Sequence, residues 1–221
     1  MKKEIYLIEC LTNMHVGAGD KEVSLIDSCV QRDIVTNYPV INGSSLKGAL
    51  RNHFVKQQNE SIDKIFGKEN TEEPGSISVE GKIKFLTANL VAYPVVGLDN
   101  SHNEVYTLCT TEEIKKEFET LTGKKFSEIK QLEPLIKITE SEMKDYIDKL
   151  PVIARNKLEN GLSQNLWYEE VVPRYTKFYF IVLSEDGETL KEFEAEIKNE
   201  EWIQIGANAS VGYGYCKIGK C

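Results

Sequence analysis

The sequence lacks any long apolar segment. No stretch approaches the roughly 20 consecutive apolar residues that a membrane-spanning helix needs. The N-terminal run MKKEIYLIECL is interrupted by Glu4 and Glu9, which argues against a secretory signal. The five cysteines form no C-x-x-C pair and no metal-ligand spacing, so we expect free thiols in a reducing compartment. Together these absences predict a cytoplasmic protein that is not associated with a membrane.

The sequence also lacks the basic excess that is typical of a free nucleic-acid-binding protein. It has 27 Lys and Arg against 35 Asp and Glu, which gives a formal net charge of −8. The charge is unevenly distributed, because the first sixty residues carry seven basic and seven acidic residues. The whole acidic excess therefore lies in the remainder, much of it between residues 112 and 149. This distribution permits a local anion-binding site near the N-terminus.

No common nucleotide-binding signature is present. Residues 11–54 contain neither a G-x-x-x-x-G-K-[ST] loop nor the three glycines of a dinucleotide fingerprint. They do contain NGSSLKGALR, which predicts a helix whose free N-terminal N–H groups favour an anion. Lys47 and Arg51 lie one turn apart on one face of this helix, where a merely solvated face is the alternative. The predicted phosphate contacts are Gly43, Ser44, Ser45, Lys47 and Arg51.

Glycines are concentrated near the C-terminus, in the run GANASVGYG. Gly206, Gly212 and Gly214 bracket Asn208 and Ser210, a composition that suits positive φ angles and a close approach of the backbone to a ligand. The alternative is a tight turn between two strands. We assign these five residues to ligand binding.

Hydrophobic periodicity predicts one α+β domain over residues 1–221. Residues 4–12 form an expected central strand, because apolar residues occupy both of its faces. A long loop over residues 13–38 precedes a helix that Ser44 or Ser45 would cap. The other expected elements are helices at 62–66, 112–121, 140–150 (capped by Thr139 or Ser141) and 190–199, a hairpin of 76–79 with 82–90, and strands at 177–183, 202–205 and 216–218. This order is compatible with a ferredoxin-like unit.

Three blocks of the sequence resemble the RAMP superfamily, and in particular the Cmr-type backbone subunits of type III-B CRISPR effector complexes. The blocks are residues 11–54, residues 150–174 (LPVIARNKLENGLSQNLWYEEVVPR) and residues 203–218 (IQIGANASVGYGYCKI). The resemblance implies a ferredoxin-like (RRM-like) fold with a helical insertion near residues 100–150 and a protruding thumb hairpin near residues 151–175. It also implies four kinds of partner: a CRISPR guide RNA, a complementary target RNA, other copies of the chain in a filament, and other subunits of the complex.

The same resemblance implies metal-dependent cleavage of target RNA, by attack of a ribose 2′-OH on the adjacent phosphate. Asp27 matches the family's catalytic loop aspartate and would hold Mg²⁺ or a similar divalent cation, with a local turn as the alternative. His15 could carry a proton, because its unperturbed pKa lies near neutrality, or it could be a hydrogen-bonded structural residue. Glu169 and Glu170 are candidates for a supporting acidic role, although adjacent residues in a strand point to opposite faces.

The resemblance also places RNA contacts along the chain. Lys47 matches the lysine of the family's Ser-Leu-Lys-Gly pattern, on the helix that binds guide RNA in the family. We assign Gln31 and Arg32, from the same block, to RNA binding as well. Trp167 and Tyr168 could stack on bases or wedge between them, or they could anchor the core. Phosphate contacts carry no sequence information, so base pairing with the guide would supply the specificity.

Three alternatives remain open at this point. A non-catalytic scaffold would keep the RNA-binding residues and would not cleave RNA. A guide-processing RAMP endoribonuclease would act on hairpin repeats without a metal and would depend on His15 or His53 with tyrosines. The backbone subunit of the type III-A (Csm) complex shares most of these features, and the block at residues 150–174 is our reason for favouring the Cmr type.

Overall fold

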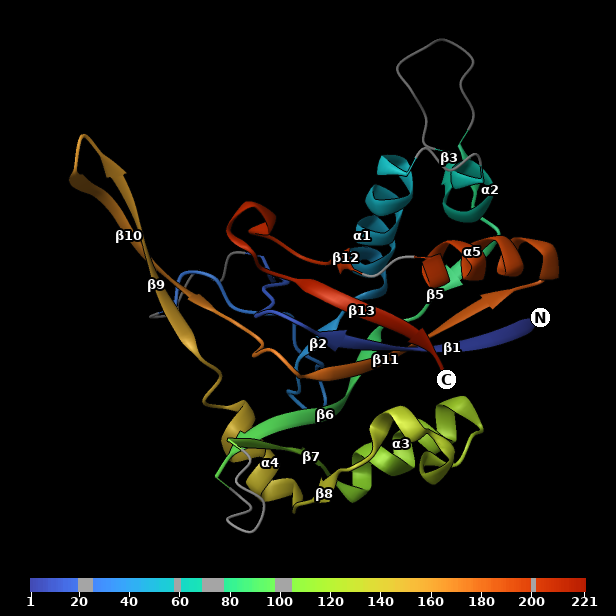
Figure 1. The fold of residues 1–221 in the computed structure, drawn as a ribbon, viewed down its shortest axis with the longest axis horizontal. Helices are drawn as coiled ribbons and strands as arrows, with labels where there is room; N and C mark the ends of the chain where they lie inside the picture. The colour runs from blue at the N-terminus through green and yellow to red at the C-terminus, as the bar shows by residue number, and fades with distance from the viewer. Residues whose placement is uncertain (20–25, 58–60, 69–77, 98–104, 200–201) are drawn as a thin grey trace.

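The computed structural model describes residues 1–19, 26–57, 61–68, 78–97, 105–199 and 202–221. Within these residues the chain folds around one large sheet, antiparallel apart from one parallel pair (Figure 1). Two short strands, β2 (Val40–Ile41) and β5 (Ile83–Phe85), pair with β6 and β11. The main path is β12 (Ile203–Gln204), β13 (Tyr215–Lys220), β1 (Lys2–Cys10), β11 (Lys177–Ser184), β6 (Ala88–Val96), β7 (Tyr106–Thr110) and β8 (Ile136–Lys137). The expected mixed α+β class is confirmed.

Strand β1 lies at the centre of this sheet, between β13 and β11. Ile8 is opposite Phe178 in β11 and Ile218 in β13, and both pairings are antiparallel. The strand is buried on both faces, since Tyr6 is 1% exposed and its neighbour Leu7, which points the other way, is 6% exposed. The expectation of a central strand is therefore confirmed, although β1 ends at Cys10 rather than at residue 12.

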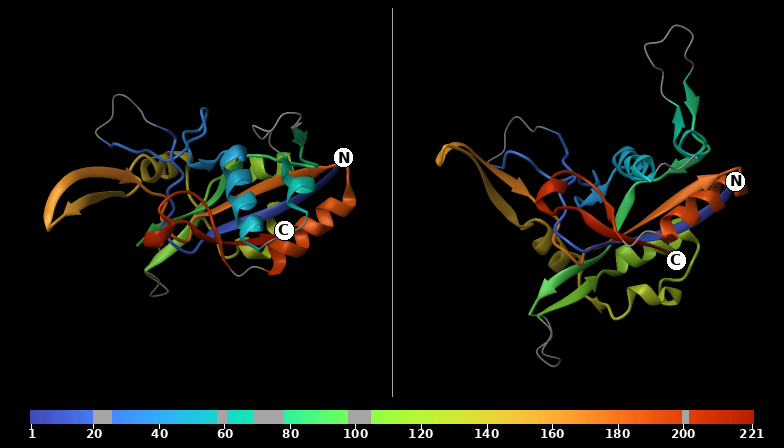
Figure 2. Two further views of the ribbon diagram at one scale, coloured as in Figure 1. Left: turned by 90° about the horizontal axis from the view of Figure 1, so that it is seen from above. Right: turned by 45° about the horizontal axis from the view of Figure 1, so that its top comes forward.

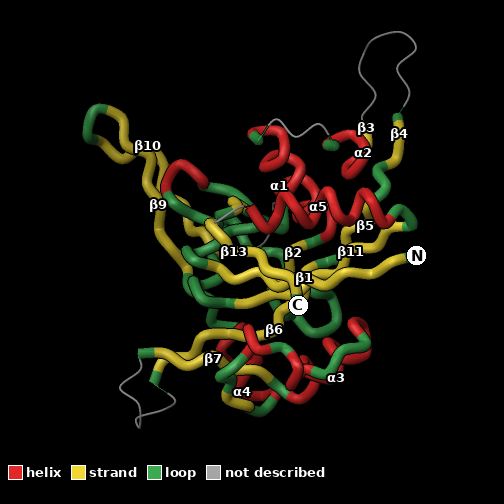
Figure 3. Tube along the Cα trace, turned by 45° about the vertical axis from the view of Figure 1, so that its right-hand side comes forward, coloured by secondary structure: helices red, strands yellow, loops and turns green. Residues whose placement is uncertain are grey.

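Helices α1 (Gly43–Lys56) and α5 (Gly187–Asn199) cover one face of the sheet, with the short helix α2 (Ile62–Phe66) beside α1 (Figure 3). Phe54 of α1 stacks on Phe193 of α5, with ring centroids 5.8 Å apart, and both side chains are fully buried. The helices expected in these places are confirmed, and α5 begins before residue 190. No helix in the described part of the chain is long and apolar enough to cross a membrane.

The opposite face of the sheet is covered by the segment between β7 and β9. Phe118 contacts Tyr179 of β11, with ring centroids 4.9 Å apart, whereas the next residue, Phe180, stacks on Tyr6 on the other side. The expected cap is made by Thr139, and it is a capping box, because the Thr139 side chain accepts from Glu142 N and the Glu142 carboxylate accepts from Thr139 N. The elements are α3 (Glu112–Thr122), α4 (Glu140–Ile147), and the 3₁₀ turns η1 (Phe126–Glu128) and η2 (Lys130–Leu132).

Strands β9 (Val152–Glu159) and β10 (Leu162–Glu170) form a separate two-stranded hairpin that projects from the body of the molecule (Figure 2). Its turn is Asn160-Gly161, and both residues have positive φ angles, 51° and 79°. Positive φ at both central residues is the requirement of a type I′ hairpin turn, which Asn-Gly satisfies best. The hairpin therefore has a sequence-encoded turn at its tip and joins the body only at its base.

The hairpin expected from residues 76–79 and 82–90 is wrong. Of these, residues 76 and 77 lie outside the described part of the chain, and β4 (Val79–Glu80) pairs with β3 (Gly67–Lys68) instead. The second half of the segment forms β5 and the start of β6, which both pair with β11. Two glycines explain the β3–β4 pairing: a Cβ on Gly67 would lie 2.5 Å from Val79 O, and one on Gly81 would lie 2.4 Å from Ile65 O. Only glycine permits this close backbone approach.

The cap expected at Ser44 or Ser45 is also wrong. Helix α1 begins at Gly43, with Asn42 at the N-cap position and no side-chain cap. Gln31 takes over the role, because its Oε1 accepts from Asn42 N at 2.8 Å and its Nε2 donates to Ser45 Oγ at 2.8 Å. The start of the helix is therefore fixed by a residue of the preceding loop rather than by its own serines.

Candidate active site and nucleic-acid interface

The described parts of the loop between β1 and β2, residues 11–19 and 26–39, are attached to each other, to the end of β10 and to the residues that follow β10. Gln31 Nε2 also donates to Gly17 O at 3.1 Å, which ties the two halves together. The contacts are isolated β-bridges between Met14 and Val172, Gly17 and Val30, Ser28 and Glu169, and Arg32 and Pro39. The sequence contained no periodic signal for this arrangement, because each contact involves a single residue pair.

His15 lies in the first half of the loop and is only 4% exposed. Its Nδ1–H donates to Glu170 O at 2.6 Å, and its Nε2 accepts from Ser28 Oγ at 3.0 Å. The carbonyl partner fixes the proton on Nδ1, because a carbonyl oxygen can only accept. Both ring nitrogens are thus occupied in a buried site, an arrangement that supports the structural role for His15.

Asp27 is exposed and lies against the hairpin strand β10. Tyr168 N–H donates to Asp27 Oδ2 at 2.8 Å, and Ser28 N–H donates to Tyr168 O at 3.2 Å. Within the described residues Oδ1 of Asp27 has no protein partner, so one carboxylate oxygen stays open to solvent. The loop aspartate is therefore held beside the base of the projecting hairpin, with a free oxygen available to a ligand.

Glu169 joins the hairpin to the glycine-rich loop. Its buried carboxylate accepts from Trp167 Nε1 at 2.8 Å, Arg155 Nη1 at 3.1 Å and Asn208 Nδ2 at 3.0 Å. The Arg155 guanidinium also lies over the rings of Trp167 and Tyr213, 6.0 Å and 5.6 Å from their centroids. The half-buried Trp167 is thus part of the hairpin base, whereas Tyr168 is 42% exposed.

Glu170 points in a different direction, as the alternation of a strand requires. Its carboxylate accepts from Arg32 Nη2 at 2.6 Å and from Val30 N at 3.0 Å, and it is 6% exposed. Arg32 Nη2 also donates to Ile147 O at the end of α4, at 3.1 Å. Glu169 and Glu170 therefore do not form a carboxylate pair, and each is neutralised by its own arginine.

The glycine-rich loop packs directly on the loop that carries His15. Ala207 N–H donates to His15 O at 2.8 Å, and a Cβ on Gly206 would lie only 2.3 Å from the same oxygen. The glycines have positive φ angles, 89° at Gly206, 86° at Gly212 and 74° at Gly214. The loop is placed between the hairpin and α1, and its exposed residues include Ser210 (Figure 1).

The N-terminal part of α1 borders a separate groove of about 540 Å³. Lys47 and Arg51 line it from the helix and Lys68 lines it from β3. Arg51 Nη2 lies 3.9 Å from Asp63 Oδ1, so this cation is partly neutralised. Gly43 has a packing role here, because a Cβ would lie 2.5 Å from Phe85 O. The remaining groove residues are Ser44, Gly48, Phe66, Gly67, Ser78, Val79, Glu80 and Gly81.

Three residues of these sites were missed in the sequence. Arg155 is directly opposite Trp167 in the hairpin register, so aligning the two strands about the Asn160-Gly161 turn would have found it. Lys68 and Ser28 gave no comparable signal, because long-range contacts bring them to their sites. The predicted catalytic residues His15 and Asp27 come from one loop, which contacts Tyr168, Glu169 and Glu170 at the end of β10, whereas Lys47 and Arg51 line the separate groove.

Comparisons with known proteins agree with this arrangement. The model of the RAMP superfamily matches residues 7–217. The chain is 30% identical to the CRISPR system Cmr endoribonuclease Cmr4 of Pyrococcus furiosus, over 99% of this chain and 95% of that one. It is 32% identical to the CMR subunit Cmr4 of Saccharolobus solfataricus, over 52% and 37% of the two chains. A chain of the type III-B Cmr-beta complex bound to cognate target RNA superposes with a TM-score of 0.81, at 22% identity and coverage of 100% and 97%.

The fold and the matched length define the class of protein: the chain belongs to the RAMP superfamily. Within that superfamily it is similar to the Cmr4 subunits of type III-B CRISPR systems. The resemblance inferred from the three sequence blocks is thereby confirmed.

Proposed function

We propose that this chain is a backbone subunit of a type III-B CRISPR effector complex that binds guide RNA and cleaves complementary target RNA. The observation that carries the proposal is the exposed carboxylate of Asp27, held by Tyr168 N–H at the base of a projecting hairpin. It occurs in a chain 30% identical, over nearly its whole length, to a Cmr endoribonuclease. The proposal includes a ferredoxin-like core within the main sheet, a thumb function for β9–β10, and a cytoplasmic location.

The proposed reaction is an internal transesterification of the target strand. The ribose O2′ attacks the adjacent phosphorus as the P–O5′ bond breaks, which leaves a cyclic 2′,3′-phosphate and a 5′-hydroxyl. One proton leaves O2′ and one is taken up by O5′, so no water is consumed. The protein contributes orientation, because in-line attack requires a kinked backbone. The hairpin base and the exposed Tyr168 lie beside Asp27, whose Oδ2 accepts from Tyr168 N–H, and such a kink would be formed there.

A divalent metal ion is part of the proposal. In the described residues no group of three or more His, Cys, Asp or Glu side chains could hold a metal. The two nearby glutamates are already paired with arginines, so among the described residues of this site Asp27 Oδ1 is the available protein ligand. This donor set fits Mg²⁺, which commonly uses one or two carboxylates together with phosphates of the substrate. Held by Asp27 and RNA phosphate, it would neutralise charge that develops at the reacting phosphate.

Guide RNA is assigned to the groove beside α1 and to the glycine-rich loop. Lys47, Arg51 and Lys68 bring positive charge to the groove, which Asp63 beside Arg51 and Glu80 in the lining offset in part. Contacts with phosphates would hold any guide sequence, and several copies of the chain would bind side by side along one guide. Gln31 supports this surface indirectly, because its side chain fixes the start of α1, whereas the side chain of Arg32 contacts Glu170 and the end of α4.

The decisive experiment is target cleavage by the complex reconstituted with guide RNA and its partner subunits. Asp27→Asn keeps an oxygen that can accept from Tyr168 N–H and removes the negative charge, so we expect target binding to persist and cleavage to be lost. Asp145→Asn, at an exposed position of α4, is the matched control and should cleave normally. EDTA should abolish cleavage by the wild-type complex. Cleavage by the Asp27→Asn complex would refute the assignment, and a wild-type complex that binds target without cutting it would establish the scaffold alternative.

A further inference from the structure

Three aromatic and cationic side chains stack where the turn between β10 and β11 meets the start of β7. The rings of Tyr175 and Tyr106 are parallel, with an angle of 2° and centroids 4.4 Å apart. The guanidinium of Arg174 lies over the Tyr175 ring, 4.9 Å from its centroid. The Tyr175 ring therefore contacts both the Tyr106 ring and the Arg174 guanidinium, and Arg174 is the exposed member of the three.

The backbone under this stack adopts an unusual conformation. Tyr175 has a φ of 72°, in the left-handed region that a bulky aromatic residue rarely occupies. Its N–H donates to Cys10 O at 2.6 Å, at the end of the central strand. Such strain persists only where surrounding contacts enforce it, and it is concentrated at functional sites. The residue in this conformation is the one whose ring contacts both Tyr106 and the exposed Arg174.

The stack is connected to the candidate active site through one residue. Arg174 N–H donates to Asn13 Oδ1 at 3.1 Å, and Gly214 N–H donates to Asn13 O at 2.8 Å. Asn13 begins the loop that carries His15 and Asp27, so the stack, the glycine-rich loop and the candidate active-site loop share an anchor. A ligand on the stack would be positioned by the same framework that positions Asp27.

We propose that Arg174, supported by Tyr175 and Tyr106, forms a stacking site for one base of a single-stranded RNA segment. The inference rests on the proposed RNA-binding function and adds a contact outside the α1 groove and the hairpin. Planar guanidinium groups stack on bases, and their charge also attracts the flanking phosphate. Among the described residues no carboxylate forms an ion pair with Arg174, so its charge is not neutralised by a salt bridge. The net charge of −8 disfavours RNA and an acidic protein segment alike, so the planar stacked side chains, which match the face of a base, are what favour RNA.

The test compares binding of two labelled oligomers of equal length to the full-length protein by fluorescence anisotropy. One is oligouridine, and the other is an oligomer of abasic ribose phosphates. Stacking of one base predicts about a tenfold preference of the wild type for oligouridine. Arg174→Lys keeps the charge and loses the planar group, so it should lose most of that preference while its melting temperature stays unchanged.

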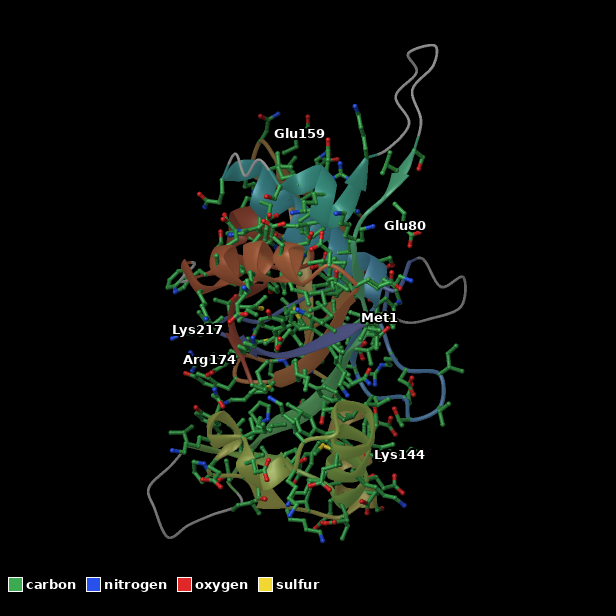
Figure 4. The ribbon with its side chains drawn as sticks, turned by 90° about the vertical axis from the view of Figure 1, so that its right-hand side faces the viewer. Met1, Glu80, Lys144, Glu159, Arg174 and Lys217 are labelled. Atoms are coloured by element: carbon green, nitrogen blue, oxygen red, sulfur yellow. The ribbon has the colours of Figure 1, made fainter. Side chains whose placement is uncertain are left out.

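Lys217→Ala is the matched control, because Lys217 is an exposed cation on the same edge of the molecule (Figure 4). It should weaken binding of both oligomers to the same extent, since it removes only an electrostatic contribution. An unchanged preference in Arg174→Lys would overturn the stacking site while leaving the proposed function intact. Failure of the wild-type protein to bind either oligomer would instead contradict the proposed function, and the stacking site with it.

A third arm uses a guide–target duplex in place of oligouridine. Its bases are already stacked and paired, so Arg174→Lys should bind it as the wild type does. An equal loss of affinity for the duplex would overturn the proposal, because it would show that Arg174 contacts phosphates alone. Altered self-association of the variant with unchanged RNA preference would likewise overturn it and assign the stack to contact between copies of the chain.

Discussion

Replacing Gly206 with alanine tests whether the glycine-rich loop must lie against the loop that carries His15. The substitution lowers the free energy of unfolding in two separate ways. A non-glycine residue in the left-handed region costs about 1–2 kcal/mol, and Gly206 has a φ of 89°. In addition, the new Cβ would lie 2.3 Å from His15 O, so the two backbones must separate. That movement breaks the hydrogen bond from Ala207 N to His15 O, which is worth about 0.5–1.5 kcal/mol.

The expected loss of unfolding free energy for Gly206→Ala is therefore about 1.5–3.5 kcal/mol. Gly212→Ala is an internal control, because Gly212 has nearly the same φ, 86°, and a Cβ added there would meet no other atom within 4 Å. The control should lose only about 1–2 kcal/mol. Urea unfolding measures both values, and for a chain of this size each kcal/mol lowers the melting temperature by about 2–4 °C. Equal destabilisation by the two substitutions would refute the close approach at His15.

Three further predictions concern the ion pair, the groove and a buried tyrosine. Glu170→Ala leaves the Arg32 guanidinium buried without its carboxylate, so urea unfolding should show a loss of about 3–5 kcal/mol, against less than about 1 kcal/mol for the exposed Glu112→Ala. Lys47→Ala should reduce the slope of log affinity against log salt by about 1, measured with guide RNA. Burial raises the pKa of Tyr93 to about 12, so stability present below pH 10 is lost as the pH rises towards 12. In alkaline urea titrations Tyr93→Phe should lose less stability over that interval than the wild type.

Local sequence patterns predicted the main elements of this fold. The apolar run of β1, the helical spacing of Leu46, Leu50 and Phe54, and the cap at Thr139 each depend on residues close together in the chain. Such patterns report which faces are buried, and the structure agrees. The failures are two-residue strands, such as β3 and β4, whose pairing depends on close backbone contacts at Gly67 and Gly81. No periodicity can be read from two residues.

In the candidate active site too, the sequence indicated individual residues, whereas their contacts depend on parts of the chain that are far apart. The resemblance to RAMP proteins singled out Asp27, but its partner Tyr168 is 141 positions away in the chain. Only the fold of the loop against β10 shows that one Asp27 oxygen is occupied and the other open. In the same way, the sequence shows a histidine close to glycines but does not predict that its ring is buried and hydrogen-bonded at both nitrogens. The roles of these residues in cleavage stay predictions that the Asp27→Asn experiment addresses.

The segment between β6 and β9 also bears on how small such a subunit can become. Strand β7 pairs with residues Tyr93 to Val96 of β6, and β8 then continues the sheet beyond it. A version without residues 105–150 would leave the backbone N–H and C=O groups of β6 unpaired at the edge of the sheet. It would also expose Tyr179 on the face of the sheet. Such an edge recruits strands from other molecules. A minimal subunit would therefore need a replacement edge strand, and a short linker in place of the segment would yield aggregates.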